Sequence, residues 1–396
     1  MISGREKALK EILSIKNSNI LCELPTSFGK SKIALYLINK SKNKSKILIV
    51  IPRLVLIQNW KDEFKKWGFE SLLSNVEFVT YVSFPKKAGI WDIIIFDEVH
   101  HLSPRCREAL EDFRIKQSIM LSATVTPKMK QELKYRFKDL FIYSISTKQA
   151  IEDEVLADPT VYLIPLLLDN QRKSYTIVKN PKCKKSITID YKERWKYSKV
   201  KNVKIIITCT QRQYYDDLSS LISWYKKRNY SIAFQNLFLR KSGERLKWLS
   251  NLKTSYIKEI LEHLKDYRTL TFCNGIAQTE ELGRYCINSK NKESQENLSK
   301  FNTQKINHIT ACNMIDEGMN LVNCRVGIYA SLNSSERMIK QKLGRILRHK
   351  KPVIIIPYYK NTRDEEIVQR MLEDYNSKLV KTITDFSEIN LYAKCQ

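Results

Sequence analysis

Hydrophobic and polar positions along this chain follow two alternating patterns. Short apolar runs rich in Ile, Val, Leu and Phe predict buried strands at residues 47–51, 92–96, 118–121 and 269–273. Between such runs, apolar residues recur with a helical period, as in residues 56–67. Strands that alternate with helices predict βαβ units, in which parallel sheets are covered on both faces. The predicted fold class is therefore α/β.

This alternation breaks between about residues 169 and 201. There, two β-rich stretches, YTIV and SITIDY, flank the basic sequence NPKCKK, which predicts a β-hairpin with a lysine-rich tip. A long helical stretch with many basic residues follows over about residues 210–265, and the α/β pattern then resumes. The 396 residues are enough for two domains. We expect the first over residues 1–155 and the second, with the insertion, over residues 156–396.

Composition narrows the class of partner. Lys and Arg number 69 against 42 Asp and Glu, a balance of +27, which favours a polyanion such as nucleic acid. A basic surface without such a partner is the alternative. No run approaches the roughly 20 apolar residues that span a bilayer, and the first residues, MISGREKALK, lack an apolar signal-peptide core. We therefore expect no membrane association.

Cysteine usage predicts the compartment. The nine cysteines are scattered and form no C-x-x-C pair, so we expect reduced thiols and a cytoplasmic location. The richness in Lys, Asn and Ile is typical of an A+T-rich genome, and a viral or phage protein in the cytoplasm of its host is one such case.

The first candidate site is the loop LPTSFGKS at residues 24–31, which follows an apolar strand and opens a helix. Gly29 lets the backbone turn close to a phosphate, and the helix N-terminus directs free N–H groups at it. Lys30 can reach the β and γ phosphates of ATP, and the Ser31 hydroxyl can bind Mg²⁺. The strict pattern requires Gly where Leu24 stands, so an ordinary loop is the alternative for this motif taken alone.

The second candidate site is the end of the apolar strand in WDIIIFDEVHH, at residues 91–101. Functional groups of open parallel sheets gather at the carboxyl ends of the strands. Asp97 can hold the Mg²⁺ shell there, and Glu98 can orient and deprotonate the attacking water. Paired acids after a strand also occur as solvated loops, and the spacing after a phosphate loop favours the catalytic interpretation.

These motifs, with later ones, resemble superfamily 2 helicases of the DExH type. Within them the chain is most similar to the DNA-directed branch that includes the repair helicase XPB, phage branched-DNA helicases and restriction-enzyme motor subunits. The motifs follow the family's order over nearly the whole chain: LPTSFGKS resembles motif I, IPRLVLIQNW at 51–60 motif Ia, VTY at 79–81 the next backbone-contacting segment, DEVHH motif II, LSAT at 121–124 motif III, LTFCN at 270–274 motif IV, ITACNMIDEGMN at 309–320 motif V, and QKLGRILR at 341–348 motif VI.

The resemblance implies two tandem RecA-like domains that use ATP and Mg²⁺. The implied catalytic residues are Lys30, Asp97, Glu98, Arg345 and Arg348. The implied nucleotide contacts are Arg5, Pro25, Thr26, Ser27, Phe28, Gly29, Lys30, Ser31, Asp316, Gly318 and Gln341, with Ser31 and Asp97 binding Mg²⁺. The implied nucleic-acid contacts in the core are Pro52, Arg53, Thr80, Tyr81, Asn274 and Thr310. In the family, the two arginines of motif VI reach across the cleft between domains to the γ-phosphate.

Three positions depart from the family pattern. Ser27 stands where Gly is usual, which strains the loop if φ is positive there. Arg5 lies near the place of the glutamine that reads adenine, so base selectivity is in doubt. Lys342 replaces a common Arg, which is a mild change for a phosphate contact.

The predicted function is an ATP-dependent helicase or translocase, with DNA favoured over RNA by the resembling branch. An RNA helicase is one alternative, and a basic nucleic-acid-binding protein with an inactive motor is another. The intact motif residues disfavour the inactive motor. At the insertion tip, Lys182, Lys184 and Lys185 are predicted to grip nucleic acid and wedge a junction, although a solvated basic hairpin is the alternative. A protein partner for targeting is also expected.

Overall fold

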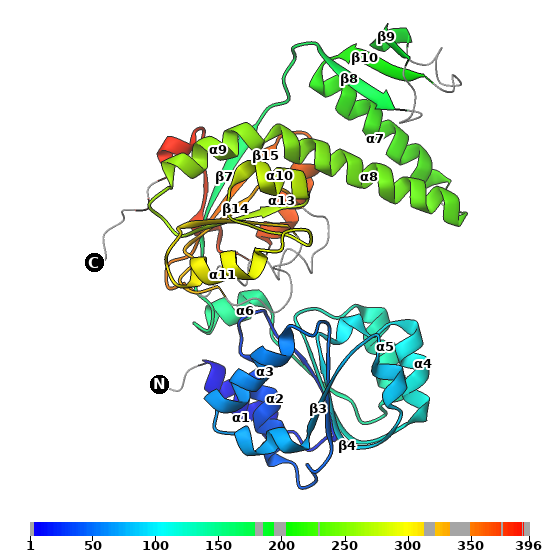
Figure 1. The fold of residues 1–396 in the computed structure, drawn as a ribbon, viewed down its shortest axis with the longest axis vertical. Helices are drawn as coiled ribbons and strands as arrows, with labels where there is room; N and C mark the ends of the chain where they lie inside the picture. The colour runs from blue at the N-terminus through cyan, green and yellow to red at the C-terminus, as the bar shows by residue number, and fades with distance from the viewer. Residues whose placement is uncertain are drawn as a thin grey trace.

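A computed structural model describes residues 4–178, 185–193, 203–228, 230–312, 321–332, 349–373, 375–389 and 391. These residues form two α/β domains, and a further part made of strands and helices projects from the second domain (Figure 1). Among the helices of the described residues, none has the length and apolar character needed to cross a membrane.

The N-terminal domain is built on a six-stranded sheet of order β3-β2-β4-β5-β1-β6, in which every pair is parallel. Its strands are β1 Asn19–Glu23, β2 Ile47–Ile51, β3 Val76–Thr80, β4 Gly89–Asp97, β5 Phe113–Ser122 and β6 Phe141–Ser144. Its α-helices are α1 Gly4–Ser14, α2 Lys30–Lys40, α3 Leu56–Lys66, α4 Pro104–Ala109, α5 Pro127–Arg136 and α6 Thr147–Glu152. Short 3-10 turns are η1 Glu70–Asn75, η2 Phe84–Lys87, η3 Val99–His101 and η4 Leu110–Asp112.

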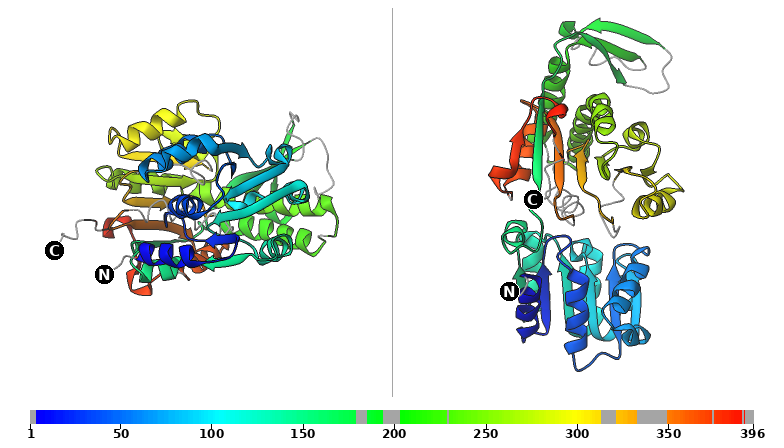
Figure 2. Two further views of the ribbon diagram at one scale, coloured as in Figure 1. Left: turned by 90° about the horizontal axis from the view of Figure 1, so that it is seen from below. Right: turned by 90° about the vertical axis from the view of Figure 1, so that its left-hand side faces the viewer.

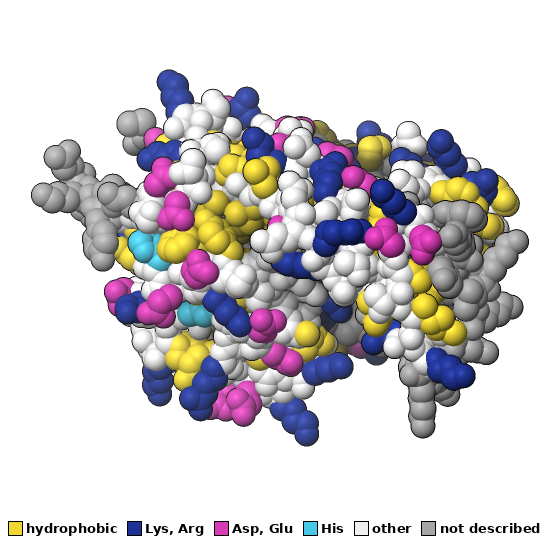
Figure 3. Space-filling model, turned by 90° about the horizontal axis from the view of Figure 1, so that it is seen from above, with side chains coloured by type: hydrophobic (Ala, Val, Ile, Leu, Met, Phe, Trp, Pro, Cys, Tyr) yellow, Lys and Arg dark blue, Asp and Glu magenta, His cyan; other side chains and the backbone are white. Residues whose placement is uncertain are grey.

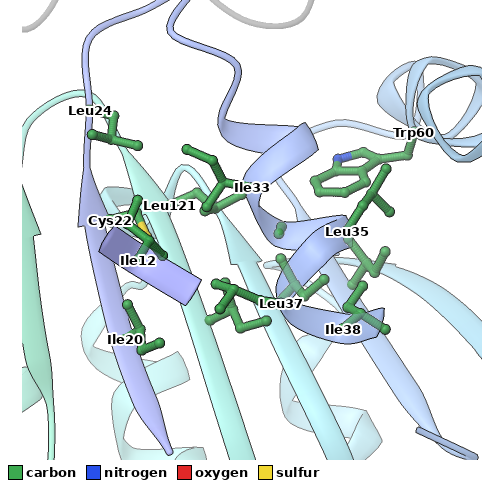
Figure 4. Close-up of a cluster of buried hydrophobic side chains, with 14 of the residues drawn as sticks. Ile12, Ile20, Cys22, Leu24, Ile33, Leu35, Leu37, Ile38, Trp60 and Leu121 are labelled. Carbon is green, nitrogen blue, oxygen red and sulfur yellow. The ribbon is translucent and has the colours of Figure 1, made fainter. Parts of the chain in front are cut away.

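Helices cover both faces of this sheet (Figure 2), which explains why the strand β2, ILIVI, is buried at every position. Alternate side chains of one strand enter two separate cores: Ile49 packs toward α1, α2 and α3, whereas Leu48 and Val50 pack on the opposite face. Figure 4 shows the first core, where side chains of α1, β1, α2 and β5 point at one another. These cores fix α2 against the sheet, and therefore fix the loop that precedes it.

The C-terminal domain is built on a seven-stranded parallel sheet of order β12-β13-β11-β14-β15-β7-β16. Its strands are β7 Thr160–Leu166, β11 Thr269–Cys273, β12 Cys286–Ile287, β13 His308–Cys312, β14 Val326–Tyr329, β15 Val353–Tyr359 and β16 Val380–Thr382. Its helices are α9 Thr254–His263, α10 Ile276–Leu282, α11 Ser294–Asn302 and α13 Arg363–Leu372, with turns η6 Ser377–Leu379 and η7 Phe386–Glu388. Two sheets of parallel strands confirm the predicted tandem RecA-like architecture. The predicted boundary at residue 155 lies between α6 and β7.

The insertion between β7 and α9 corrects one expectation. It contains β8 Lys173–Val178, β9 Ser186–Asp190, β10 Lys204–Cys209, α7 Gln211–Lys227 and α8 Ile232–Leu252. The strands predicted as the two arms of a hairpin do form, but β10 lies between them, in the order β8-β10-β9. β10 runs antiparallel to β8 and parallel to β9. The strand KIIITC takes the central place because Ile205, Ile207 and Cys209 are all buried, and a central strand satisfies the hydrogen bonds of both its edges.

Candidate nucleotide site and nucleic-acid surface

The loop between β1 and α2 has the backbone conformation of a phosphate cradle. Ser27 and Gly29 both have positive φ, at 71° and 104°, and α2 begins directly afterwards at Lys30. The strain foreseen for Ser27 is present, because a non-glycine residue in the left-handed region costs on the order of 1 kcal/mol or more. The turn is closed by Phe28 N, which donates to Pro25 O at 3.2 Å.

The loop is open above Gly29 and carries a buried hydroxyl that has no hydrogen-bond partner. A Cβ added at Gly29 would meet no atom within 4 Å, so the surface above this turn is open. The Thr26 hydroxyl is buried and has no hydrogen-bond partner, an arrangement that is unusual for a protein interior. Pro25 and Phe28 are themselves buried and shape the loop from below. Open space above an N-terminal helix turn, with a buried hydroxyl beside it, fits the phosphates of a nucleotide.

Lys30 and Glu98 meet in front of this loop. Lys30 Nζ lies 3.3 Å from Glu98 Oε1 and 3.5 Å from Leu24 O. Glu98 follows β4 with φ 53°, a left-handed conformation that turns its side chain back toward the sheet edge. The two predicted catalytic residues are therefore brought together from motifs that are far apart in sequence.

A hydrogen-bonded network joins Glu98 to motif III. Ser122 Oγ donates to Glu98 Oε2 at 3.4 Å and accepts from Thr124 N at 3.3 Å. His100 Nδ1 lies 2.9 Å from Ser122 Oγ and 3.4 Å from Glu98 Oε2. A movement of the Glu98 carboxylate would therefore change hydrogen bonds both at the end of β5 and in the turn after β4.

Asp97 is held by two aromatic donors. Trp60 Nε1 on α3 donates to Asp97 Oδ2 at 3.0 Å, and the Tyr81 hydroxyl donates to Asp97 O at 2.8 Å. Sequence patterns did not reveal either contact, because each joins segments that are not adjacent in the chain. The only sequence signal was that both aromatic residues lie within or beside the predicted nucleic-acid segments.

Glu23, at the end of β1, was also missed. Its carboxylate accepts from Val125 N at 2.9 Å, Lys130 Nζ at 2.6 Å and Ser144 Oγ at 2.9 Å. Burial alone would raise the pKa of Glu23, but these donors, led by Lys130, hold that pKa below its usual value. The residue thereby ties the strand before the phosphate loop to the segment that follows motif III.

Arg5, predicted near the adenine, contacts the phosphate loop from behind. Its guanidinium donates to Ser27 O at 3.2 Å and to Val155 O at 3.0 Å. Burial lowers the pKa of Arg5. The side chain therefore ties α1, the loop and the end of the first domain together, and these contacts do not favour base reading.

The predicted nucleic-acid residues of the core differ in accessibility. Arg53 is exposed, and Pro52 and Thr80 are half-buried. The Tyr81 ring is only 6% exposed and is used on Asp97, so its burial disfavours a surface contact. Thr310, predicted to contact nucleic acid, is fully buried because β13 lies inside the second sheet, and its hydroxyl donates to Thr279 O at 3.0 Å. This burial disfavours a direct contact.

Other predicted residues in the second domain are placed only in part. Asn274 lies at the end of β11, where its amide donates to Leu332 O at 3.3 Å, and its Oδ1 is buried with no hydrogen-bond partner. Lys185 is exposed. The remaining predicted residues lie outside the described part of the chain: Lys182, Lys184, Asp316, Gly318, Gln341, Arg345 and Arg348.

Comparisons with known proteins agree with this geometry. Residues 3–88 match the DEAD/DEAH box helicase family and residues 252–350 match the helicase conserved C-terminal domain. The chain is 23% identical over 391 residues to the DNA 3'-5' translocase XPB2 of Sulfurisphaera tokodaii, covering 93% of this chain and 83% of that protein. The two family matches and this relative support a superfamily 2 helicase.

Solved structures share the fold of this helicase. Dbp5 of S. cerevisiae, bound to RNA and ADP BeF3, superposes with a TM-score of 0.60 at 11% identity, covering 96% of this chain and 90% of that chain. A putative HsdR subunit of a type I restriction enzyme from Vibrio vulnificus gives 0.56 at 16% identity, covering 96% and 68%. The family matches support ATP-hydrolysing helicase activity.

Proposed function

We propose that this helicase couples ATP hydrolysis to movement along DNA, and thereby unwinds or remodels duplex or branched DNA. The observation that carries the proposal is the carboxyl edge of the first sheet, where Lys30 and Glu98 meet at 3.3 Å beside Asp97. The net charge of +27 favours a nucleic acid of either kind, and the likeness to a protein named as a DNA translocase favours DNA. The RNA-bound neighbour Dbp5 shares the fold at 11% identity and supports no choice of sugar.

Residues of the first domain divide the work on ATP. The N–H groups at Gly29 and the start of α2 bind phosphate, and Lys30 exchanges Glu98 for the β and γ phosphates. Ser31 and Asp97 would hold Mg²⁺, which would supply positive charge to neutralise the charge that develops on the phosphates. Among the described residues, no group of three or more Asp, Glu, His or Cys side chains is placed to hold a metal ion. Glu98, released from Lys30, orients the attacking water.

The second domain completes the site in this proposal. Arg345 and Arg348 stabilise transition-state charge from across the cleft, so that hydrolysis requires the domains to close. Asp316, Gly318 and Gln341 contact the nucleotide from the same side.

The insertion is proposed as an additional grip on nucleic acid, through Lys182, Lys184 and Lys185 and through the α7–α8 arm. Residues 218–243 contain five basic residues and no acidic one. At the turn between α7 and α8, Tyr230 and Ile232 are 79% and 78% exposed. Beside this turn, Arg228 lies over the Trp224 ring at 4.1 Å. Basic side chains bind phosphates, and exposed aromatic rings stack on unpaired bases. Seen from above, basic side chains are spread among acidic and hydrophobic ones (Figure 3). The exposed turn between α7 and α8 is therefore a more specific candidate for nucleic-acid contact than the overall charge.

The test of the proposed substrate is ATP turnover with single-stranded DNA, double-stranded DNA or RNA of equal length. We expect DNA to stimulate turnover and RNA to stimulate it less. Equal or greater stimulation by RNA would make this an RNA helicase.

The insertion is tested by replacing Lys182, Lys184 and Lys185 with Ala. DNA affinity should fall, and the slope of its salt dependence should shrink by up to about one unit per lost phosphate contact, while turnover at saturating DNA is retained. An unchanged affinity and slope would leave these lysines as a solvated surface. A protein partner, a cytoplasmic location and a viral or phage source stay predictions.

A further inference from the structure

Asp97 receives hydrogen bonds from both segments of the first domain that are proposed to contact nucleic acid. Residues 52–55, between β2 and α3, form a loop that we call the Arg53 loop. Trp60 Nε1, on α3, donates to Asp97 Oδ2 at 3.0 Å. The Tyr81 hydroxyl, directly after Thr80, donates to the Asp97 carbonyl at 2.8 Å. The two segments are also joined to each other, because Tyr81 N donates to Ile51 O at 3.3 Å.

The path from the Arg53 loop to Trp60 is short and well packed. Leu56 N donates to Arg53 O at 3.1 Å and Ile57 N to Leu54 O at 3.0 Å, so the loop is bonded into the first turn of α3. Trp60 follows one helical turn after Leu56, is only 3% exposed, and lies beside α2 (Figure 4). Because close-packed interiors transmit displacement, a ligand that moves the Arg53 loop also moves the indole.

The loop itself presents a surface that a ligand can contact. Leu54 and Val55 are 66% and 51% exposed, and Val82, beside Tyr81, is 84% exposed. The outer ends of both segments are therefore accessible, while their inner ends are buried against Asp97.

A donor on one carboxylate oxygen fixes the rotation of the whole group. Hydrogen bonds of this kind to a metal-binding carboxylate set its orientation, and their loss typically costs about 10- to 100-fold in metal affinity or activity. The indole N–H of Trp60 is in the place to do this for Asp97, and the Tyr81 hydroxyl holds the main chain of the same residue.

We propose that Trp60 is a positioning residue: its indole N–H holds the Asp97 carboxylate in the orientation that binds Mg²⁺, and it carries contact between nucleic acid and the Arg53 loop to the ATP site. Tyr81 supports the same residue from the second segment. The nucleic-acid part rests on the proposed function. The part that concerns Mg²⁺ depends only on the role of Asp97, and can be measured without nucleic acid.

The experiment compares Trp60→Phe with Trp67→Phe in the full chain. Trp67 is a matched control, because its Nε1 donates to Glu63 Oε2 at 2.8 Å at the far end of α3. Binding of a fluorescent ADP analogue is measured against Mg²⁺ concentration, without nucleic acid. We expect Trp60→Phe to need about tenfold more Mg²⁺ and to bind the analogue normally when Mg²⁺ is absent. Trp67→Phe should match the parent protein, and thermal melting verifies that both variants fold.

Two further variants keep the test decisive. Combined with Asp97→Asn, the substitution Trp60→Phe should have no additional effect on Mg²⁺-dependent binding, since the coupling between the two residues is already lost. If Trp60→Phe unfolds the domain, incorporation of benzothienylalanine at position 60 removes only the N–H and keeps the ring size. An unchanged Mg²⁺ requirement in the folded variant would overturn the positioning role.

The proposed coupling between nucleic acid and the ATP site is tested by how strongly nucleic acid stimulates ATP turnover. Trp60→Phe should reduce the ratio of ATP turnover with and without single-stranded DNA at saturating Mg²⁺, while DNA affinity stays normal. A full stimulation ratio together with a raised Mg²⁺ requirement would overturn the coupling and retain the positioning. If the parent protein shows no stimulation by any nucleic acid, the proposed function fails, whereas the Mg²⁺ result still decides the role of Trp60.

Discussion

The sheets of the two domains differ in the side chains that lie at the carboxyl ends of their strands. At the carboxyl ends of β1 and β4, charged side chains of opposite sign converge, with Lys30 Nζ at 3.3 Å from Glu98 Oε1. After β11 and β14 in the second domain, neutral groups bond one another instead: Asn274 N donates to Ser331 Oγ at 3.0 Å, and Ser331 Oγ donates to Gln278 Oε1 at 3.0 Å. The first edge holds charges that a ligand can exchange, whereas the described groups after β11 and β14 are mostly hydrogen-bonded to one another, with Asn274 Oδ1 as an exception.

This difference indicates a division of labour. Ser250, at the end of α8, joins the neutral cluster by donating to Gln278 Oε1 at 2.6 Å, and Gln278 Nε2 returns a bond to Ser250 O at 2.8 Å. The base of the insertion is thereby fastened to the strand ends of the second sheet. A satisfied buried network rigidifies the structure around it. We infer that the first edge performs chemistry, whereas the described part of the second edge is a stiff platform that anchors the insertion.

The largest effects should come from the charged edge. Lys30→Ala and Glu98→Gln should each abolish ATP turnover, because one removes a phosphate contact and the other the group that activates water. Glu98→Gln should still bind ATP, since the phosphate contacts remain. Steady-state turnover and binding of a fluorescent nucleotide measure the two effects separately. Loss of nucleotide binding in Glu98→Gln would contradict the role given to it.

The next largest effect tests whether the second domain contributes chemistry at all. Arg348→Ala should lower nucleic-acid-stimulated turnover by about 10³- to 10⁵-fold, the scale of an arginine finger, with far less change in ATP affinity. Arg345→Ala is the matched comparison. Near-normal turnover in Arg348→Ala would transfer the role to Arg345.

Substitutions at the base of the insertion should affect folding and not chemistry. Lys253 and Asp364 form a fully buried pair, with Nζ 2.8 Å from Oδ2. Lys253→Met leaves a buried carboxylate alone and should cost about 3–5 kcal/mol in the free energy of unfolding. Adding Asp364→Leu should recover most of this loss, because an apolar pair needs no desolvation. Chemical denaturation checks both. A double variant as unstable as the single one would show that packing, and not the unpaired charge, is responsible.

The residues at the carboxyl edge of the first sheet could be predicted from the sequence, whereas those at the same edge of the second sheet largely could not. Motifs I, II and III are short and each lies at a strand end, so their convergence followed from parallel-sheet topology alone. Pairing across long distances could not be read in the same way: β10 between β8 and β9, Trp60 on Asp97, and the burial of Thr310 all depend on which strands become neighbours. The hairpin prediction was wrong because it rested on local turn signals, whereas β10, which is distant from the turn, pairs with both β8 and β9.

The smallest effect is expected at the opposite, amino-terminal edge of the second sheet, and it depends on pH. His308 begins β13 and is half-buried, and its Nε2 lies 3.2 Å from Thr271 Oγ1. Burial lowers the pKa of His308 from 6.5 to about 4, because the interior disfavours the charged ring. Between these values the unfolded chain binds a proton that the folded chain does not.

Stability should therefore fall as pH decreases from about 6.5 through about 4, and the loss should be complete only below pH 4, where both states are protonated. The shift corresponds to about 3 kcal/mol at most in the free energy of unfolding. His308→Gln cannot titrate, so it should reduce the slope of stability against pH in this window, whatever its effect at pH 8. Denaturation midpoints from pH 4 to 8 measure the difference between the two proteins. ATP turnover at pH 8 should be the same in both, since this edge faces away from the charged site. Equal slopes would mean that His308 is protonated without cost in the folded domain, and a loss of turnover at pH 8 would show that the two edges of the sheet are coupled.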